Sequence, residues 1–397
     1  MSQRLATDQL ETLKAQNVLS TFQDVTIVPT QRFHQRIHCG GPIWPDFENR
    51  HFERQCRKGA PVDTCPTAPD TVQLRREEGV WGGFLDRQFG HLVAEHLSRL
   101  PIAKSAWPEK RFFFTIEPGL AVSDIPNYVW DLLAWFGVEQ DAVDIVTQPI
   151  RVETLHACAQ GETLPAETPV DGYLDLLETI TSQQGLKPDP HQITYVSREG
   201  QLAKGGGGHL GEDYLIKCLV DLGVHVLDPA RVTPKQQMQT YAGSKTLIFA
   251  EGSALHGRQL LGRLDQDIHV LRRRKNRWMA QRVLAPRVAK LEYHDTADSE
   301  LAFYRKDGHK KVDCTAALYN VPVLLDLFED LGVPLRSVWD QAAYENTVAA
   351  EALNWLQQHN LQPEHMLENL DRLSGAGITI MEKTSTPSSP FAATGTH

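Results

Sequence analysis

The stretch TLIFAEGSALHGR, residues 246–258, decides the fold of this chain. Its apolar run, Leu247–Ala250, is typical of a buried strand, and Glu251-Gly252-Ser253 ends that run. Leucines at helical spacing follow as far as Leu264 and predict a helix. A buried strand that turns through Gly and Ser into a helix exposes backbone N–H groups at its carboxyl end, where parallel α/β folds bind anions. We therefore expect an anion-binding turn at this point of the chain.

The segments around this turn alternate between strands and helices. Strands are predicted at 192–198, 224–229, 246–250 and 267–271, and a helix is predicted near 210–222. Another helix begins after Thr233, where Thr233-Pro234-Lys235-Gln236 is a capping box with proline at the first helical position. This order predicts a doubly wound, Rossmann-like nucleotide-binding domain over 186–285.

The first half of the chain, 1–185, is predicted to be a second α/β domain. Gly82-Gly83 indicates a tight turn, and the periodicity that follows predicts a helix from Asp86 that ends before Pro101. Strands are expected at 112–116 and 144–148, with a helix at 125–137 between them. Residues 1–80 show little regular pattern apart from a strand at 25–29, and 39–70 is expected to be a loop.

The last part of the chain, 286–397, is expected to be a helical extension with a disordered tail. Helices are predicted at 318–332 and 337–360. The Ser/Thr/Pro-rich end, 384–397, has the composition of a disordered segment.

The composition is that of a folded protein with an acidic balance. The 397 residues are 41% hydrophobic and 23% charged, with a formal net charge of -10, which argues against a nucleic-acid partner. The six cysteines form no Cys-x-x-Cys pair, the N-terminus has no apolar signal core, and no stretch approaches the roughly 20 apolar residues of a membrane span. We expect a cytoplasmic protein.

One basic segment, RRRKNRWMAQR at 272–282, stands apart from this acidic balance. It has two interpretations, and the sequence leaves both open. It is either a solvated helix start or a peripheral contact with an anionic membrane surface or a lipid-diphosphate acceptor at the inner membrane face.

Several short motifs, in order along residues 80–275, resemble glycosyltransferase family 61. They are Gly82-Gly83, Gly90-His91 with Glu95, Arg99-Leu100, Tyr195-Val196-Ser197-Arg198, Val226-Leu227-Asp228-Pro229, Gln236-Gln237 and Gly252-Ser253-Ala254-Leu255-His256. The resemblance implies two facing Rossmann-like domains, known as the GT-B arrangement, and an inverting, metal-independent transfer of a sugar. It implies a nucleotide sugar as donor substrate, a glycan or lipid-linked glycan as acceptor, and a role in the biosynthesis of capsular or other surface polysaccharides.

Such a transfer needs positive groups for the leaving diphosphate. Arg198, at the carboxyl end of its strand, is the first candidate, and the N–H groups at Gly252, Ser253 and Ala254 are the second. His256 is a candidate to assist them, against the alternative of a packed helical histidine. Lys204, in front of the glycine run 205–208, is either a phosphate contact or a solvated side chain.

The acceptor hydroxyl needs a general base. His91 and Glu95 are spaced i, i+4 on one helix face, so we predict His91 as the base and Glu95 as the group that orients it. The alternative is a structural His–Glu contact. Glu251 is a further candidate base or sugar-hydroxyl ligand. No third ligand stands near His91 and Glu95 at a zinc-like spacing, and we expect neither a metal nor another cofactor.

Two other functions remain open at this point, because a fold does not fix a chemistry. The same scaffold serves sugar-nucleotide epimerases and hydrolases. The second alternative is that the chain is a non-catalytic partner that binds a nucleotide sugar or glycan. Nucleotide binding separates an enzyme from a scaffold, and hydrolysis without an acceptor would indicate a hydrolase.

Overall fold

The structure is a computed structural model that describes residues 11, 18–35, 37–57, 60–163, 169–305, 307–359 and 361–380. The predicted disordered end, 384–397, lies outside these residues. The chain divides into two units. Unit 1 comprises 1–199 and 216–296, and unit 2 comprises 200–215 and 297–397. Unit 1 therefore contains the first α/β half expected from the sequence, 1–185. It also contains the second half, 186–285, apart from residues 200–215.

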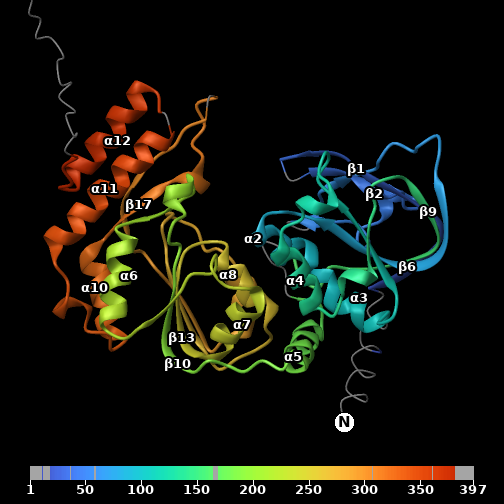
Figure 1. The fold of residues 1–397 in the computed structure, drawn as a ribbon, viewed down its shortest axis with the longest axis horizontal. Helices are drawn as coiled ribbons and strands as arrows, with labels where there is room; N and C mark the ends of the chain where they lie inside the picture. Colours follow the sequence, from blue (N-terminus) through green and yellow to red (C-terminus); the bar gives the residue numbers. More distant parts are fainter. Residues whose placement is uncertain are drawn as a thin grey trace, which may run out of the picture. The chain divides into compact units, whose positions relative to one another are not determined.

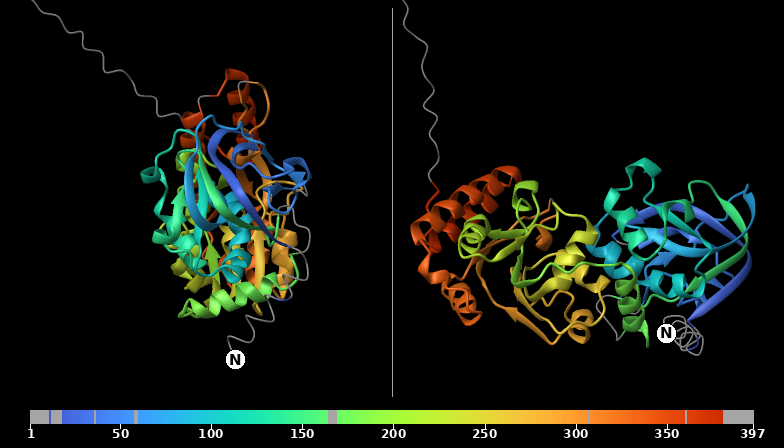
Figure 2. Two further views of the ribbon diagram at one scale, coloured as in Figure 1. Left: turned by 90° about the vertical axis from the view of Figure 1, so that its right-hand side faces the viewer. Right: turned by 60° about the horizontal axis from the view of Figure 1, so that its bottom comes forward.

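The first half of unit 1 is built on a mixed sheet. Its described strands run in the order β5-β2-β1-β9-β6-β7-β8. Their bounds are β1 (Leu19–His34), β2 (Ile37–Pro42), β5 (Asp63–Thr64), β6 (Gln73–Leu85), β7 (Arg111–Ile116), β8 (Val143–Ile145) and β9 (Ile150–Cys158), and a short ribbon pairs β3 (Cys56–Arg57) with β4 (Ala60–Pro61). Strands β6, β7, β8 and β9 are parallel, whereas β1 runs antiparallel to β2 and β9. Figure 2 shows β1 and β9 side by side.

Helices cover one side of this sheet. They are α2 (Phe89–His91), the π-helix η2 (Leu92–His96), η3 (Leu97–Arg99), α3 (Leu100–Ala106), η4 (Val122–Asp124), α4 (Asn127–Trp135), η5 (Gln140–Ala142) and α5 (Tyr173–Gln183), and η1 (Phe47–Asn49) precedes them. The helix expected to end before Pro101 continues to Ala106. The reason is that Pro101 lies in the first turn of α3, where its missing N–H has no partner to lose.

The second half of unit 1 is a parallel sheet in the order β12-β10-β13-β14-β15. The strands are β10 (His191–Val196), β12 (His225–Leu227), β13 (Ser244–Ala250), β14 (Asp267–Leu271) and β15 (Lys290–His294), and the helical segments are α6 (Glu212–Asp221), α7 (Pro234–Gly243), α8 (Ala254–Gly257), η7 (Arg258–Leu260), α9 (Gln281–Leu284) and η8 (Ala285–Arg287). Helices α7 and α8 lie beside β10 and β13 (Figure 1). The capping box at Thr233 forms in both directions, as the sequence predicts.

The core of unit 1 joins its two halves. Strands β7 and β13 are buried along nearly their whole length, and one apolar cluster runs from Phe112 and Leu132 to Leu247 and Phe249. A second cluster, around Trp44 and other side chains of the mixed sheet, is separate from it. Each buried aromatic side chain stabilises the fold by about 1.5–3 kcal/mol relative to exposure. This continuous cluster packs the two halves of unit 1 against each other.

Unit 2 combines three strands with helices. The strands are β11 (Gly208–Leu210), β16 (Ala297–Leu301) and β17 (Ala316–Tyr319), and the helices are η6 (Leu202–Lys204), η9 (Val312–Cys314), α10 (Val321–Asp330), η10 (Leu335–Ser337), α11 (Gln341–His359) and α12 (Pro363–Gly375). Strand β17 is parallel to β11 and antiparallel to β16. The region after 286, expected to be helical, thus also contains β15, β16 and β17.

The early part of the chain is more regular than its sequence suggests. Residues 1–80, expected to be mostly irregular, contain β1, β2 and the first part of β6. Gly82-Gly83, expected to form a tight turn, lies inside β6 at a shift in register. A side chain at Gly82 would come within 2.3 Å of the Phe114 ring, so the strand needs glycine there for close packing.

Candidate active site

Positive groups gather at the carboxyl edge of the parallel sheet. Strand β13 is central, with β10 on one side and β14 on the other. Arg198 follows β10, and Arg272, Arg273 and Arg274 follow β14. The β13–α8 turn, which we define as Glu251, Gly252 and Ser253, lies between them. The sheet order therefore produces the convergence of Arg198 and this turn that was expected from the sequence.

The Arg198 side chain lies directly against Gly252. A Cβ atom at Gly252 would be 1.8 Å from the Arg198 Nη1 and 2.7 Å from its Cζ. No side chain fits in that space, so glycine is required for the guanidinium to cover the turn. Arg198 is only half-buried, and the preceding Ser197 is buried with a hydroxyl that has no hydrogen-bond partner among the described residues. Polar groups therefore collect at the end of β10.

Some backbone N–H groups at the start of α8 bond to carbonyls of the turn, and the N–H groups before them do not. The amides of Leu255 and His256 bond to the carbonyls of Gly252 and Ser253, at 3.2 and 3.0 Å. The amides of Ser253 and Ala254 precede them and are the first N–H groups of α8, where a helix leaves its donors without internal partners. Ser253 is exposed. The geometry therefore leaves N–H donors for an anion beside Arg198.

His91 and Glu95 form the pair predicted from their spacing. The His91 Nδ1 is 3.0 Å from the Glu95 Oε1, and the His91 side chain is 24% exposed whereas that of Glu95 is 3% exposed. A carboxylate only accepts, so Nδ1 donates and Nε2 keeps its lone pair. Arg57 completes the group, because its Nε lies 3.1 Å from the same Glu95 oxygen. This arrangement leaves a histidine nitrogen ready to accept a proton.

A π-helix holds this pair in place. The wide turn at Leu92–His96 frees the Glu95 carbonyl, which accepts hydrogen bonds from the side chains of Gln55 and Gln160 at 3.1 and 2.6 Å. The buried Arg99 guanidinium bonds to the carbonyls of Glu53 and Arg54, both at 3.2 Å, and so fastens the segment that carries Arg57. Such π-turns are frequent at functional sites.

The two halves of unit 1 touch at this point. A Cβ atom at Gly90 would lie 3.0 Å from the His256 Cδ2 and 3.1 Å from the Ser253 Cβ. Helix α2 therefore packs against the start of α8 without an intervening side chain. The residue after Gly90 is His91, so the histidine–carboxylate pair stands next to the β13–α8 turn.

Part of the chain that forms this arrangement matches a known protein family. Residues 89–258 match the family described as Glycosyltransferase 61. This match supports a glycosyltransferase. No curated protein gave a significant match to the chain. The domain begins at Phe89, beside His91, and ends at Arg258, just after His256, so it contains both sides of the contact. A domain of this family implies a nucleotide-sugar donor and a glycan acceptor.

His256 in this glycosyltransferase is a buried, neutral side chain. Burial is the largest cause that lowers its pKa to about 4, while the hydrogen bond to Gln259 and the nearby Glu95 carboxylate raise the pKa and the Arg274 guanidinium lowers it. The His256 Nδ1 is 2.7 Å from the Gln259 Oε1. Because the amide oxygen only accepts, Nδ1 carries the proton and Nε2 is an acceptor. His256 therefore offers a lone pair rather than a positive charge.

The Gln259 side chain extends this contact into a buried chain between the halves. Its Nε2 donates to the Glu162 Oε1 at 3.0 Å, and the other Glu162 oxygen accepts from Arg287 at 2.8 Å. Glu162 and Arg287 are both fully buried, and burial raises the pKa of Glu162. Removing one member would leave a buried charge unpaired. The hydrogen bonds from His256 through Gln259 to Glu162 fix His256 relative to the first half of unit 1.

Glu251 has a structural task in this arrangement. Its side chain is fully buried, and one of its oxygens accepts from the amides of Arg273 and Arg274 at 2.9 and 3.1 Å. The other oxygen pairs with the Arg274 guanidinium at 2.8 Å. Both oxygens are therefore engaged, and Glu251 holds the segment after β14 at the site. This geometry favours His91 over Glu251 as the group that accepts a proton.

The basic segment 272–282 differs from the solvated helix start that was one interpretation of its sequence, and its membrane contact stays a prediction. Arg272, Arg273 and Arg274 are buried and lie outside any helix, since α9 begins at Gln281. Residues 275–278 and Arg282 remain exposed. Sequence reasoning missed Arg274 and Arg57 as site residues. The signal for Arg274 was available, because the segment follows a strand adjacent to β13 in a doubly wound sheet.

Lys204 belongs to a different unit from the rest of these residues. It is exposed at the end of η6 in unit 2. The glycine run after it makes a local backbone hydrogen bond, in which the Gly206 amide donates to the Gln201 carbonyl at 2.8 Å. Its predicted phosphate contact stays a prediction. The site described above consists of residues of unit 1.

Proposed function

We propose that this glycosyltransferase moves a sugar, with inversion and without a metal ion, from a nucleotide sugar to a hydroxyl group of a glycan or lipid-linked glycan in surface polysaccharide biosynthesis. One observation carries the proposal. Arg198 covers Gly252, while Gly90, the residue before His91, packs against Ser253 and His256. Diphosphate-binding donors and a proton acceptor therefore meet at one point. The two α/β halves of unit 1 would face each other across it, as in the GT-B arrangement.

The leaving group determines the role of the parallel sheet. As the bond between the sugar C1 and the phosphate oxygen breaks, negative charge grows on the nucleoside diphosphate. Arg198 and the amides of Ser253 and Ala254 would bind its oxygens. Arg274, held by Glu251, would add positive potential from the other side of β13. Fixed donors of this kind need no rearrangement during the reaction, which lowers the barrier.

The acceptor determines the role of the first half. The acceptor hydroxyl attacks C1 from the face opposite the diphosphate, and the His91 Nε2 takes its proton. Glu95 stabilises the imidazolium that forms, and Arg57 forms an ion pair with Glu95. A single displacement of this kind inverts the configuration at C1. The chemistry needs a base and a positively charged cradle, and the described residues supply both.

His256 and Ser197 are suited to hydroxyl groups of the donor. The His256 Nε2 is an acceptor because Nδ1 donates to Gln259. The buried Ser197 hydroxyl lacks a partner and adjoins Arg198. We propose that these two groups bind sugar or ribose hydroxyls beside the diphosphate. A polar ligand would remove the cost of burying an unpaired hydroxyl.

The exposed part of the basic segment is the proposed contact with a lipid-linked acceptor. Lys275 and Arg277 are exposed there, and Trp278 is 49% exposed. Among the described residues, no helix has the length and apolar composition needed to cross a bilayer. We propose that this contact would lie at the inner face of the membrane, on the cytoplasmic side.

A donor screen tests the proposed function. Full-length protein would be titrated with UDP, GDP and CMP in a calorimeter, and the sugar nucleotides of the bound base would then be assayed for nucleotide release with candidate acceptors. We expect one base to bind and release to depend on both acceptor and His91. Release at an equal rate without any acceptor would indicate a hydrolase instead. Binding of no nucleotide would contradict the proposal.

A further inference from the structure

Two histidines and a glutamate on the edge of the parallel sheet have no place in the proposed reaction. His269 lies on β14, and Glu292 and His294 lie on β15, the last strand of the sheet. The strands are parallel, with His269 opposite Glu292 and Leu271 opposite His294. Side chains two residues apart share one face of a strand, so all three side chains project from the same face.

The spacing of their atoms suits a metal ion. The His269 Nδ1 is 2.9 Å from the His294 Nε2 and 3.4 Å from the Glu292 Oε2, which is 3.9 Å from the His294 Nε2. The point equidistant from these three atoms lies about 2.0 Å from each, and zinc binds histidine nitrogen and carboxylate oxygen at about 2.0–2.2 Å. The three atoms thus define three positions around an ion.

We propose that His269, Glu292 and His294 bind a divalent transition-metal ion of the zinc class. Zinc-class ions bind a set of two imidazoles and one carboxylate more readily than Mg²⁺ or Ca²⁺ does. Glu292 and His294 have side chains that are 41% and 21% exposed, so solvent reaches the ion and fills its remaining position. The ion would fasten the edge strand β15 to β14.

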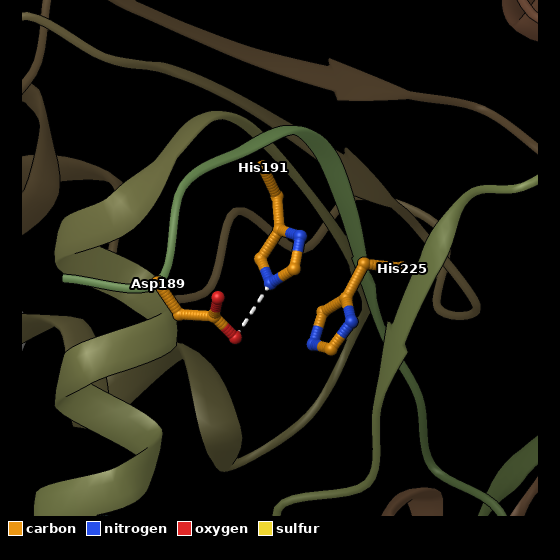
Figure 3. Close-up of side chains that lie close together, drawn as sticks. All are labelled: Asp189, His191 and His225. Atoms are coloured by element: carbon orange, nitrogen blue, oxygen red, sulfur yellow. Dashed lines mark hydrogen bonds and ion pairs between the residues drawn. The ribbon is translucent and has the colours of Figure 1, made fainter.

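A second cluster on the same sheet provides a matched comparison. Asp189, His191 and His225 lie at the start of β10 and β12, and the His191 Nε2 is 2.9 Å from the Asp189 Oδ2 (Figure 3). The two imidazoles stack face to face, with centroids 3.8 Å apart and planes 8° from parallel. The His269 and His294 planes are also only 20° apart, but their centroids are 5.1 Å apart and their nearest nitrogens 2.9 Å apart, so these rings meet by their nitrogens rather than face to face. We expect this cluster to bind more weakly.

The test uses full-length protein treated with a chelator and then titrated with Zn²⁺ or Co²⁺. We expect one equivalent to bind, and Zn²⁺ to raise the midpoint of thermal unfolding. Glu292→Gln and His294→Asn should each weaken binding roughly 10- to 100-fold or more, and His225→Asn should not. Mg²⁺ should give no shift. Glu292→Gln lies on a partly exposed side chain, so it should keep the fold.

Three outcomes would overturn the metal site. They are no binding of either ion by the unmodified protein, loss of binding in His225→Asn but not in Glu292→Gln, and an absorption band of cobalt bound to thiolate, which would assign the ion to cysteines. All six cysteines lie within the described residues and are free thiols. The readouts are binding and stability, so they stand apart from the outcome of the donor screen.

Discussion

His91 and His256 lie on segments that touch, yet their surroundings are opposite. His91 is partly exposed and bonded to a carboxylate, whereas His256 is buried and bonded to the neutral amide of Gln259. A carboxylate stabilises an imidazolium, and burial opposes one. The difference teaches that two histidines in neighbouring motifs have different chemistry, one suited to accept a proton and the other to remain neutral.

The largest expected effect separates the two histidines by rate. His91→Asn should lower kcat roughly 10²- to 10⁴-fold, because it removes the proton acceptor while it keeps a hydrogen bond to Glu95. His256→Gln should raise KM for the donor with a smaller change in kcat. Steady-state nucleotide release would measure both. Equal losses of kcat in the two variants, or full activity of His91→Asn, would remove the distinction drawn here.

The next effect concerns the turn that both histidines adjoin. Gly252→Ala places a methyl group 1.8 Å from the Arg198 Nη1 and should displace the guanidinium. We expect nucleotide affinity to fall roughly 10- to 100-fold, as in Arg198→Ala, because a hydrogen bond to a charged group is worth about 1.5–3 kcal/mol. Calorimetric titration would measure the affinities.

Gly375→Ala is the matched control for this substitution. Gly375 ends α12, and a Cβ atom there would meet nothing within 4 Å. Affinity should stay unchanged in this variant. Unchanged affinity in Gly252→Ala as well would show that Arg198 is not part of the nucleotide site.

A smaller effect tests how His91 is supported. Arg57→Gln removes the cation beside the buried Glu95 carboxylate. We expect kcat to fall about tenfold, corresponding to about 1.4 kcal/mol. KM for the donor should stay unchanged, because Arg57 contacts Glu95 rather than Arg198 or the β13–α8 turn. Steady-state kinetics measure both constants. A change in KM alone would instead place Arg57 at the donor.

The smallest effect is a dependence of stability on pH that belongs to His256. Its pKa is about 4 in the folded protein and about 6.5 when unfolded, so its contribution to stability is present above pH 6.5 and is lost as the pH falls toward 4. The midpoint of thermal unfolding should fall by a few degrees less in His256→Gln than in the unmodified protein over this range. His38 and His294 act in the same direction and set the background. Parallel curves for the two proteins would contradict the assignment.

The parallel sheet was the most predictable part of the fold. Strand β14 has the predicted bounds, and α7 begins at its capping box, because both signals are local. The long strand β6 was missed, since its charged residues and its glycines at 82 and 83 hide the pattern of a strand. The helix expected to run on to Leu264 ends at Leu260 instead, where the buried Arg258 guanidinium bonds to the carbonyls of Leu261 and Gly262.

The candidate site was predictable where it follows from sheet topology and i, i+4 spacing. Arg198 meets the β13–α8 turn because their strands are neighbours, and His91 meets Glu95 because they are one turn apart. Arg57 was not predictable, because it reaches Glu95 from a segment 38 residues away that looked like a loop. The Gln259–Glu162–Arg287 chain likewise depends on contacts between distant segments.

The central claim is that a nucleoside diphosphate binds where Arg198 covers the β13–α8 turn. A crystal structure with the nucleoside diphosphate that calorimetry selects would test it most directly. We predict phosphate oxygens within about 2.7–3.2 Å of the Arg198 guanidinium and the Ser253 amide, with His91 facing the position of the sugar. A diphosphate bound elsewhere, with Arg198 still packed on Gly252, would contradict the account.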